Sequence, residues 1–279
     1  MKTRKLNILI PTDFSDNAWN AVVYILKFYE EYVCTFYFLH SVKMAAPKTT
    51  LNSGKLTEVL SNTAKEELKD LKSLAETSNA NDNHSFETVL SNDTLNSAIE
   101  FCVKKYNIDL VVMGTKGATG AKEVLFGSNT VNAIKKMRVC PVIIIPEEFD
   151  FVTPKQIAFP TNFNRAYNKI ELNTLKSLAL VHDSKIRVVH IEKSKELSAV
   201  QQNNVQNLKN ALEEFEVSFH WMPHYTNLTE EINDFIEELK IDVLAMVNYK
   251  HSFIEDLMHE PVITKIGHRL KIPFLVIPD

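Results

Sequence analysis

The chain has 279 residues, of which 45% are hydrophobic and 24% charged, and its formal net charge is −4. This composition is typical of a globular protein with one large or two ordinary domains. The small negative charge argues against nucleic acid as a partner, and no apolar stretch approaches the ~18 residues that would span a membrane. Three widely spaced cysteines without a CxxC pair indicate free thiols, a reducing compartment and a cytoplasmic location.

The first half of the chain alternates apolar runs with amphipathic segments. The apolar runs predict strands over residues 6–10, 33–39, 84–90, 110–113 and 141–145. Helical spacing predicts helices capped by Ser15 and by Asn92 or Asp93, a helix over 55–75, and one from Gly127 to near Met137. This alternation predicts a parallel sheet with helices on both faces and right-handed crossovers. The polar segment 43–54 is either a surface loop or a flap over a ligand.

Three glycines, Gly114, Gly117 and Gly127, lie between a predicted strand and a predicted helix. Glycine allows left-handed backbone angles and lets the backbone approach a ligand closely. A helix that begins at Ser128 would present unpaired N–H groups and partial positive charge, which favour phosphate. The stretch therefore predicts a site for the phosphates of a nucleotide. It matches neither the P-loop pattern nor the dinucleotide fingerprint.

Two acidic residues near these segments have to be interpreted. Asp13 follows the first strand and precedes the first helix, at the edge of a parallel sheet where ligands bind. It is therefore either a ligand contact or a turn carboxylate. Glu123 is the acidic residue nearest the glycines, and we interpret it as a solvated loop residue, so no catalytic residue is predicted.

The second half of the chain repeats the first. Residues 156–163 echo residues 7–14, residues 241–246 mirror 108–113, and residues 272–278 mirror 140–146. We therefore predict two copies of one α/β domain, at residues 1–148 and 153–279.

The second copy lacks the residues that predict the phosphate site in the first. It has Asn162 for Asp13, Val247 for Gly114, Lys250 near the place of Gly117, and Glu260 close to the place of Gly127 or Ser128. A glutamate at a helix N-terminus would repel a triphosphate, so we expect no nucleotide there. His251, His259, Glu260 and His268 fit no zinc template and are best interpreted as solvated loop residues.

The pattern Gly114-x2-Gly117-x9-Gly127-Ser128, with Pro11-Thr12-Asp13 and the closing strand, resembles the signature of the universal stress protein family. The resemblance implies two Rossmann-like domains of the adenine nucleotide α-hydrolase-like kind, each a five-stranded parallel sheet of order 3-2-1-4-5. It also implies ATP, with or without Mg²⁺, between the first and fourth strands. Carried over position by position, the nucleotide-binding residues would be Pro11, Thr12, Asp13, Ser41, Met113, Gly114, Lys116, Gly117, Gly127, Ser128, Asn129 and Thr130.

At two of these positions, Ser41 and Lys116, the role in nucleotide binding is open. Ser41 stands where the family often has valine, which leaves the adenine contact open. Lys116 is either a phosphate contact or a solvated loop lysine. No protein ligand to a metal is predicted.

The resemblance implies an ATP-binding protein of stress response or signalling, in which ATP acts as a conformational ligand. A slow ATPase or nucleotide-dependent transferase is the enzyme alternative, and small-molecule binding by the second domain is another. Family members commonly dimerise through the last strand. We therefore expect residues 141–145 and 274–277 to pair within one chain as a pseudo-dimer, with a homodimer of two chains as the alternative.

Overall fold

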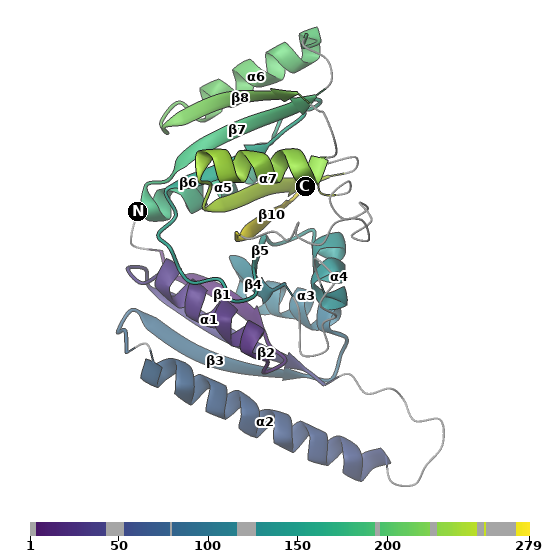
Figure 1. The fold of residues 1–279 in the computed structure, drawn as a ribbon. Helices are drawn as coiled ribbons and strands as arrows, with labels where there is room; N and C mark the ends of the chain where they lie inside the picture. The colour runs from purple at the N-terminus through teal and green to yellow at the C-terminus, as the bar shows by residue number, and fades with distance from the viewer. Residues whose placement is uncertain are drawn as a thin grey trace. The chain divides into compact units, whose positions relative to one another are not determined.

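The computed structural model describes residues 4–42, 53–78, 80–115, 127–192, 196–223, 228–249, 254 and 272–279. The chain divides into two compact units, with the boundary between Phe151 and Val152, and Figure 1 labels the elements of both. We call the part up to Phe151 unit 1 and the part from Val152 onward unit 2, and describe each by itself.

Unit 1 is a five-stranded parallel sheet with helices between its strands. Its elements are β1 (Leu6–Pro11), α1 (Asp16–Phe28), β2 (Cys34–Ser41), α2 (Ser53–Ser78), β3 (His84–Ser91), α3 (Leu95–Tyr106), β4 (Leu110–Gly114), α4 (Ser128–Lys136) and β5 (Val142–Ile145). The strand order is β3-β2-β1-β4-β5, and every described pairing within it is parallel. The predicted order 3-2-1-4-5 is confirmed.

Side chains at the helix ends explain where two helices of unit 1 begin. Ser15 is the N-cap of α1, as predicted, and its hydroxyl oxygen accepts a hydrogen bond from the Ala18 amide. The prediction that Asn92 or Asp93 caps α3 is wrong, because Thr94 is the N-cap. Asn and Asp also favour turns, and here the turn residues come just before the cap.

The core of unit 1 consists of central strands that are buried on both faces, as helices on both sides of a parallel sheet require. The four residues of β5 are all buried, as are the last four of β1. The three cysteines are free and buried in this core. Burial raises the pKa of the Cys102 thiol to about 11 and that of Cys140 to about 12, so these thiols are unreactive at neutral pH.

Unit 2 repeats this architecture. Its elements are β6 (Gln156–Pro160), α5 (Lys169–His182), β7 (Lys185–Glu192), α6 (Ala199–Ala211), β8 (Val217–Pro223), α7 (Leu228–Leu239), β9 (Val243–Asn248) and β10 (Phe274–Pro278). Its strand order, β8-β7-β6-β9-β10, is again 3-2-1-4-5 when counted from β6. The repeated fold is thus present in both units, and the pairing of the two last strands stays a prediction.

The sequence predicts a helix over residues 205–215 and another that Thr229 caps and that ends at Leu239, and the structure starts both helices elsewhere. The helix predicted over 205–215 begins at Ala199, because Ser198 and Gln201 form a capping box. Thr229, predicted to cap α7, lies inside that helix, which begins at Leu228.

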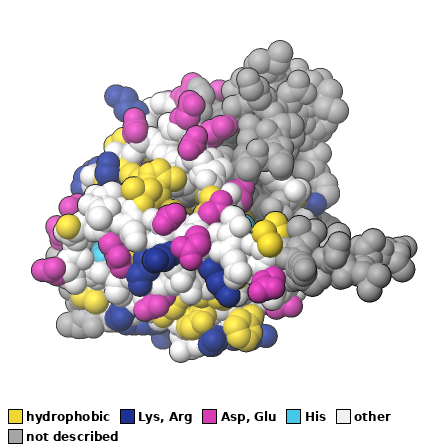
Figure 2. Space-filling model, turned by 90° about the horizontal axis from the view of Figure 1, so that it is seen from below, with side chains coloured by type: hydrophobic (Ala, Val, Ile, Leu, Met, Phe, Trp, Pro, Cys, Tyr) yellow, Lys and Arg dark blue, Asp and Glu magenta, His cyan; other side chains and the backbone are white. Residues whose placement is uncertain are grey.

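No described helix combines the length and hydropathy of a membrane span. On the face shown in Figure 2, the described basic and acidic side chains are interspersed with separate hydrophobic patches. Charges of both signs therefore lie close together on the described part of this face.

Two partly buried histidines give the fold a pH dependence. Burial lowers the pKa of His84 in β3 and of His220 in β8 from the ordinary value of 6.5. The unfolded chain therefore binds protons more readily than the folded chain, and stability is expected to fall as the pH drops below about 6.5. Urea unfolding between pH 5 and pH 8 measures this. The His84→Gln variant keeps a donor for the Tyr29 carbonyl, 3.1 Å from Nε2, and should flatten the profile; an unchanged slope would contradict the assignment.

Candidate functional site

The strand order of unit 1 reverses between β1 and β4. β1 pairs with β2 on one side and with β4 on the other, although β4 comes two strands later in the chain than β2. At such a reversal the connections leave in opposite directions, and a crevice opens at the carboxyl ends of the strands. Pro11 ends β1 and Gly114 ends β4, so both lie at this edge.

The turn at residues 11–14 is held by several hydrogen bonds and a ring contact. The Thr12 amide donates to the Leu39 carbonyl at 2.8 Å, and the Thr12 carbonyl oxygen lies 2.8 Å from His40 Nδ1. Thr12 Oγ1 accepts from the Phe14 amide at 3.0 Å. Phe14 has a positive φ of 62°, which is unusual for a bulky residue, and its ring stacks on His40 with centroids 4.6 Å apart. Several contacts therefore hold Phe14 in an unfavourable backbone conformation, a feature that is common at functional sites.

Asp13 is exposed on this turn, beside the N-terminus of α1. Its Oδ1 accepts hydrogen bonds from the Ser15 amide at 3.2 Å and from the Ser15 hydroxyl at 2.6 Å. The turn-carboxylate interpretation is therefore correct as a structural role. A ligand contact through the same exposed carboxylate stays a prediction.

The N-terminus of α4 lies at the carboxyl end of β4. The Gly127 amide donates to the Thr115 carbonyl at 2.6 Å, and the Thr130 hydroxyl donates to the Gly114 carbonyl at 2.9 Å. Gly127 is the N-cap and supplies no side-chain cap, while Ser128 and Asn129 are exposed. The first turn of α4 thus presents main-chain N–H groups and the positive end of the helix dipole at this edge. The Thr130 hydroxyl was expected to serve the phosphates, but in this structure it binds the backbone.

The two described glycines of the signature do not use left-handed backbone angles, so that part of the prediction is wrong. Gly127 has φ −61°, which any residue can adopt. Gly114 is required for space, because a Cβ there would lie 2.9 Å from Asn17 Nδ2 and 3.1 Å from the Asn17 carbonyl oxygen. Close approach of α1 to β4, rather than backbone freedom, therefore explains Gly114.

The remaining predicted residues are placed as follows. Ser41 ends β2, and its hydroxyl donates to the Asp93 carbonyl at 2.6 Å. Met113 is buried in β4. Lys116 and Gly117 lie outside the described residues. Among the described residues, no group of three or more His, Cys, Asp or Glu could hold a metal ion.

Unit 2 contains the same turn at residues 160–163. The Thr161 amide donates to Val189 at 2.9 Å, His190 Nδ1 lies 2.8 Å from the Thr161 carbonyl, and Thr161 Oγ1 accepts from the Phe163 amide at 3.0 Å. Phe163 also has a positive φ, 55°. The sequence analysis did not predict a structural role for Phe14 or Phe163. The signal that could have found them is their repetition, because a phenylalanine follows Pro-Thr-Asp in the first copy and Pro-Thr-Asn in the second.

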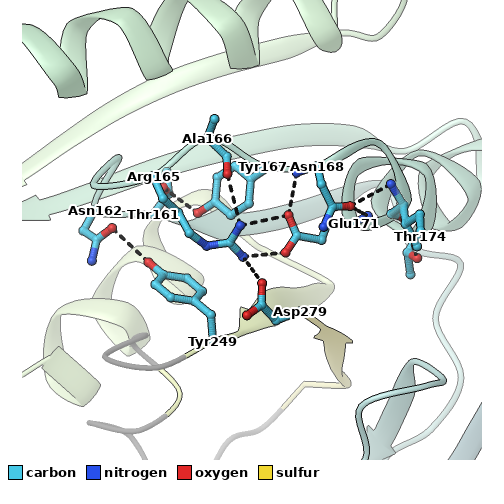
Figure 3. Close-up of polar contacts among 11 residues, drawn as sticks. Thr161, Asn162, Arg165, Ala166, Tyr167, Asn168, Glu171, Thr174, Tyr249 and Asp279 are labelled. Carbon is cyan, nitrogen blue, oxygen red and sulfur yellow. Dashed lines mark hydrogen bonds and ion pairs between the residues drawn. The ribbon is translucent and has the colours of Figure 1, made fainter.

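The surroundings of the two turns differ. In unit 2 the Tyr249 hydroxyl donates to Asn162 Oδ1 at 2.9 Å, and Arg165 lies over the Tyr249 ring (Figure 3). Arg165 in turn forms ion pairs with Glu171 and Asp279. The position that corresponds to Asp13 is therefore in contact with side chains of unit 2 itself.

A protein-family model, described as the universal stress protein family, matches residues 6–146, which lie in unit 1. The chain belongs to the universal stress protein family. A universal stress protein of Methanocaldococcus jannaschii is 32% identical over 142 residues, which are 50% of this chain and 80% of the relative.

Solved structures support the fold of this universal stress protein over both units. One from Archaeoglobus fulgidus aligns with a TM-score of 0.68 at 17% identity and covers 98% of this chain and 96% of its own. A putative universal stress protein from Pseudomonas aeruginosa aligns with a TM-score of 0.55 at 12% identity, over 98% of this chain and 92% of its own. At these identities the similarity establishes the fold and not the ligand.

Proposed function

We propose that unit 1 binds ATP, with or without Mg²⁺, at the carboxyl edge between β1 and β4. The observation that carries the proposal is the N-terminus of α4, where the N-cap residue Gly127 has no side chain to cap the helix and the Gly127 and Thr130 contacts join it to the end of β4. Backbone N–H groups at a helix N-terminus favour phosphate. Membership of the universal stress protein family supports ATP as the nucleotide.

In this proposal the residues after β1 and the residues after β4 would contact different parts of the nucleotide. Asp13 would lie by the adenosine, with Pro11 and Thr12 shaping the same wall, and Ser41 by the base. Met113, Gly114, Lys116 and Gly117 would line the ribose and the phosphates. The start of α4 at Gly127 would hold the phosphate tail through the main-chain N–H groups of Ser128, Asn129 and Thr130, since the Gly127 amide already donates to Thr115. Among these, Asp13 is exposed and Thr12 is held rigidly, so the wall is pre-organised.

We propose ATP as a conformational ligand in a cytoplasmic stress-response or signalling role. The carboxylate that the structure describes at this edge, Asp13, is engaged in the turn, where its Oδ1 accepts two hydrogen bonds from Ser15. A slow ATPase or transferase remains the alternative. Release of phosphate on incubation with ATP, abolished by the variant described next, would favour the enzyme.

The Ser128→Glu variant is expected to weaken ATP binding by about 30-fold or more. The new carboxylate would sit in the first turn of α4, where it repels a triphosphate and competes for the same N–H groups. A difference of about 2 kcal/mol corresponds to this factor. Because an acidic residue at a helix N-terminus stabilises the helix, the loss cannot be attributed to unfolding of α4. Isothermal titration calorimetry with Mg·ATP and with ATP alone measures the affinity.

The matched control is Ala199→Glu, which places the same charge at the first position of α6 in unit 2. It should leave ATP affinity unchanged. If the wild-type chain binds ATP and the Ser128→Glu variant binds it equally well, the proposed site is refuted. If the wild-type chain does not bind ATP, the proposed function is refuted.

A further inference from the structure

We propose that the Tyr249 ring occupies, in unit 2, the position that the adenosine takes in unit 1. Unit 2 would then be a closed counterpart of the nucleotide site that keeps its shape without a ligand. This inference rests on the ATP site proposed for unit 1 and concerns what replaces the ligand in the second copy.

The two turns share the hydrogen bonds that shape their backbone, which permits the comparison. In both, the threonine hydroxyl accepts from the phenylalanine amide at 3.0 Å, and the threonine carbonyl lies 2.8 Å from a histidine Nδ1. Asn162 therefore takes the place of Asp13. Tyr249 is the first residue after β9 and therefore lies at the carboxyl edge of its own sheet. In the sequence of unit 1 the similar position is Lys116, the second residue after β4.

The Tyr249 side chain is hydrogen-bonded to the residue that stands at this position. Its hydroxyl donates to Asn162 Oδ1 at 2.9 Å, and its ring lies at the carboxyl edge of the sheet (Figure 3). Burial raises the pKa of Tyr249, so the phenol stays protonated and remains a donor. Asn162 is a neutral acceptor, so this hydrogen bond brings no carboxylate to the phenol.

Arg165 covers the Tyr249 ring from the other side. Its guanidinium carbon lies 4.3 Å from the ring centroid, a distance suited to a cation–π contact. The same guanidinium binds both oxygens of Glu171, at 2.5 Å and 3.1 Å, and Asp279 at 3.2 Å. One cation is thus matched by two carboxylates, so among the described residues around Tyr249 the charge of Arg165 is already neutralised.

Helix α6 completes the closure. Gln201 Nε2 donates to the Asn162 carbonyl at 3.0 Å, and Asn204 Nδ2 donates to the Phe163 carbonyl at 2.8 Å. Both side chains are buried. The strained turn is therefore held from two directions by side chains of unit 2, which removes the need for a ligand to hold it.

The test uses the full-length chain with Trp19→Phe, so that Trp221 reports on unit 2. Trp221 packs near the turn, with its ring centroid 5.8 Å from that of Phe163. Tyr249→Ala is expected to lower the unfolding midpoint of unit 2 by about 10 °C. Millimolar adenosine should restore part of that loss, by a few degrees, and phenol should do the same. In the parent with Tyr249 present, neither compound should shift the midpoint.

Two results would overturn the inference: rescue of Tyr249→Ala by phenol but not by adenosine, or an adenosine-induced shift with Tyr249 present. If Tyr249→Ala does not fold, Tyr249→Phe replaces it, since it keeps the ring and loses only the hydroxyl. It should lower the midpoint by about 2–4 °C, and adding Asn162→Ala should cost only the second hydrogen bond of Asn162 Oδ1, which it accepts from the Asn164 amide. An unchanged midpoint in Tyr249→Phe contradicts the proposal.

ATP titration of the wild-type chain separates this inference from the proposed function. If ATP binds and adenosine fails to rescue Tyr249→Ala, the inference alone is wrong. If no ATP binds, the proposed function is wrong, whereas rescue by adenosine would still support a nucleoside-shaped position in unit 2.

Discussion

The Glu171→Ala variant is expected to lower the free energy of unfolding of unit 2 by about 3–4 kcal/mol. Glu171 is 1% exposed and binds the Arg165 guanidinium through both oxygens. It also accepts from the Asn168 amide at 2.7 Å and so forms half of the capping box of α5. Alanine would leave the guanidinium without its buried partner and remove one helix cap. The loss is placed low in the range for buried pairs because the Arg165 side chain is 27% exposed and partly hydrated.

The measurement is urea unfolding followed by Trp221 fluorescence in the Trp19→Phe background, because two units need not unfold as one. Glu213→Ala, at an exposed glutamate, is the matched control and should change stability by less than about 0.5 kcal/mol. Asp279→Asn should cost less than about 1 kcal/mol, because Asp279 is 51% exposed. If Glu171→Ala cost no more than these two, the buried pair would not stabilise unit 2.

The fold could be predicted from sequence because its signals are local and repeated. Buried strands such as β4 and β5 are continuous apolar runs, and the same runs recur as β9 and β10. Helix ends were harder to predict, since several polar residues in a row can each cap a helix. Thr94 was chosen over Asn92 and Asp93 by the path of the preceding turn, which no local pattern encodes.

The candidate site was predicted in its outline but not in its physical detail. The sequence located the Asp13 turn and the start of α4 at adjoining strand ends, because both follow predicted strands. It could not show that Gly114 makes room for Asn17, since that contact joins residues from different elements. The Arg165, Glu171 and Tyr249 cluster was missed for the same reason: Tyr249 is 78 residues or more from its partners and matches no motif.

The Gly114→Ala variant is expected to destabilise unit 1 by about 1–3 kcal/mol and to weaken ATP binding with it. The added Cβ would lie 2.9 Å and 3.0 Å from the Asn17 side chain and 3.1 Å from its backbone oxygen. The side chain can rotate away, but the backbone oxygen belongs to the first turn of α1. That turn would have to shift, and it begins at Ser15, which binds Asp13. The change therefore disturbs stability and the proposed adenosine wall together.

Two further variants separate this steric effect from other roles of glycine. Asn17→Ala in the Gly114→Ala background removes two of the three close contacts and should recover part of the lost stability.

Gly127→Ala should leave stability within about 0.5 kcal/mol, because the loss of unfolded-state entropy offsets a weaker cap at φ −61°. It should still weaken ATP binding, since its methyl group would stand where phosphate approaches the amides. Unfolding followed by Trp19 fluorescence with Trp221→Phe, and ATP calorimetry, measure both quantities. Equal stability losses at the two glycines would show that Gly114 is not a packing residue, and that the approach of α1 to β4 does not shape this edge.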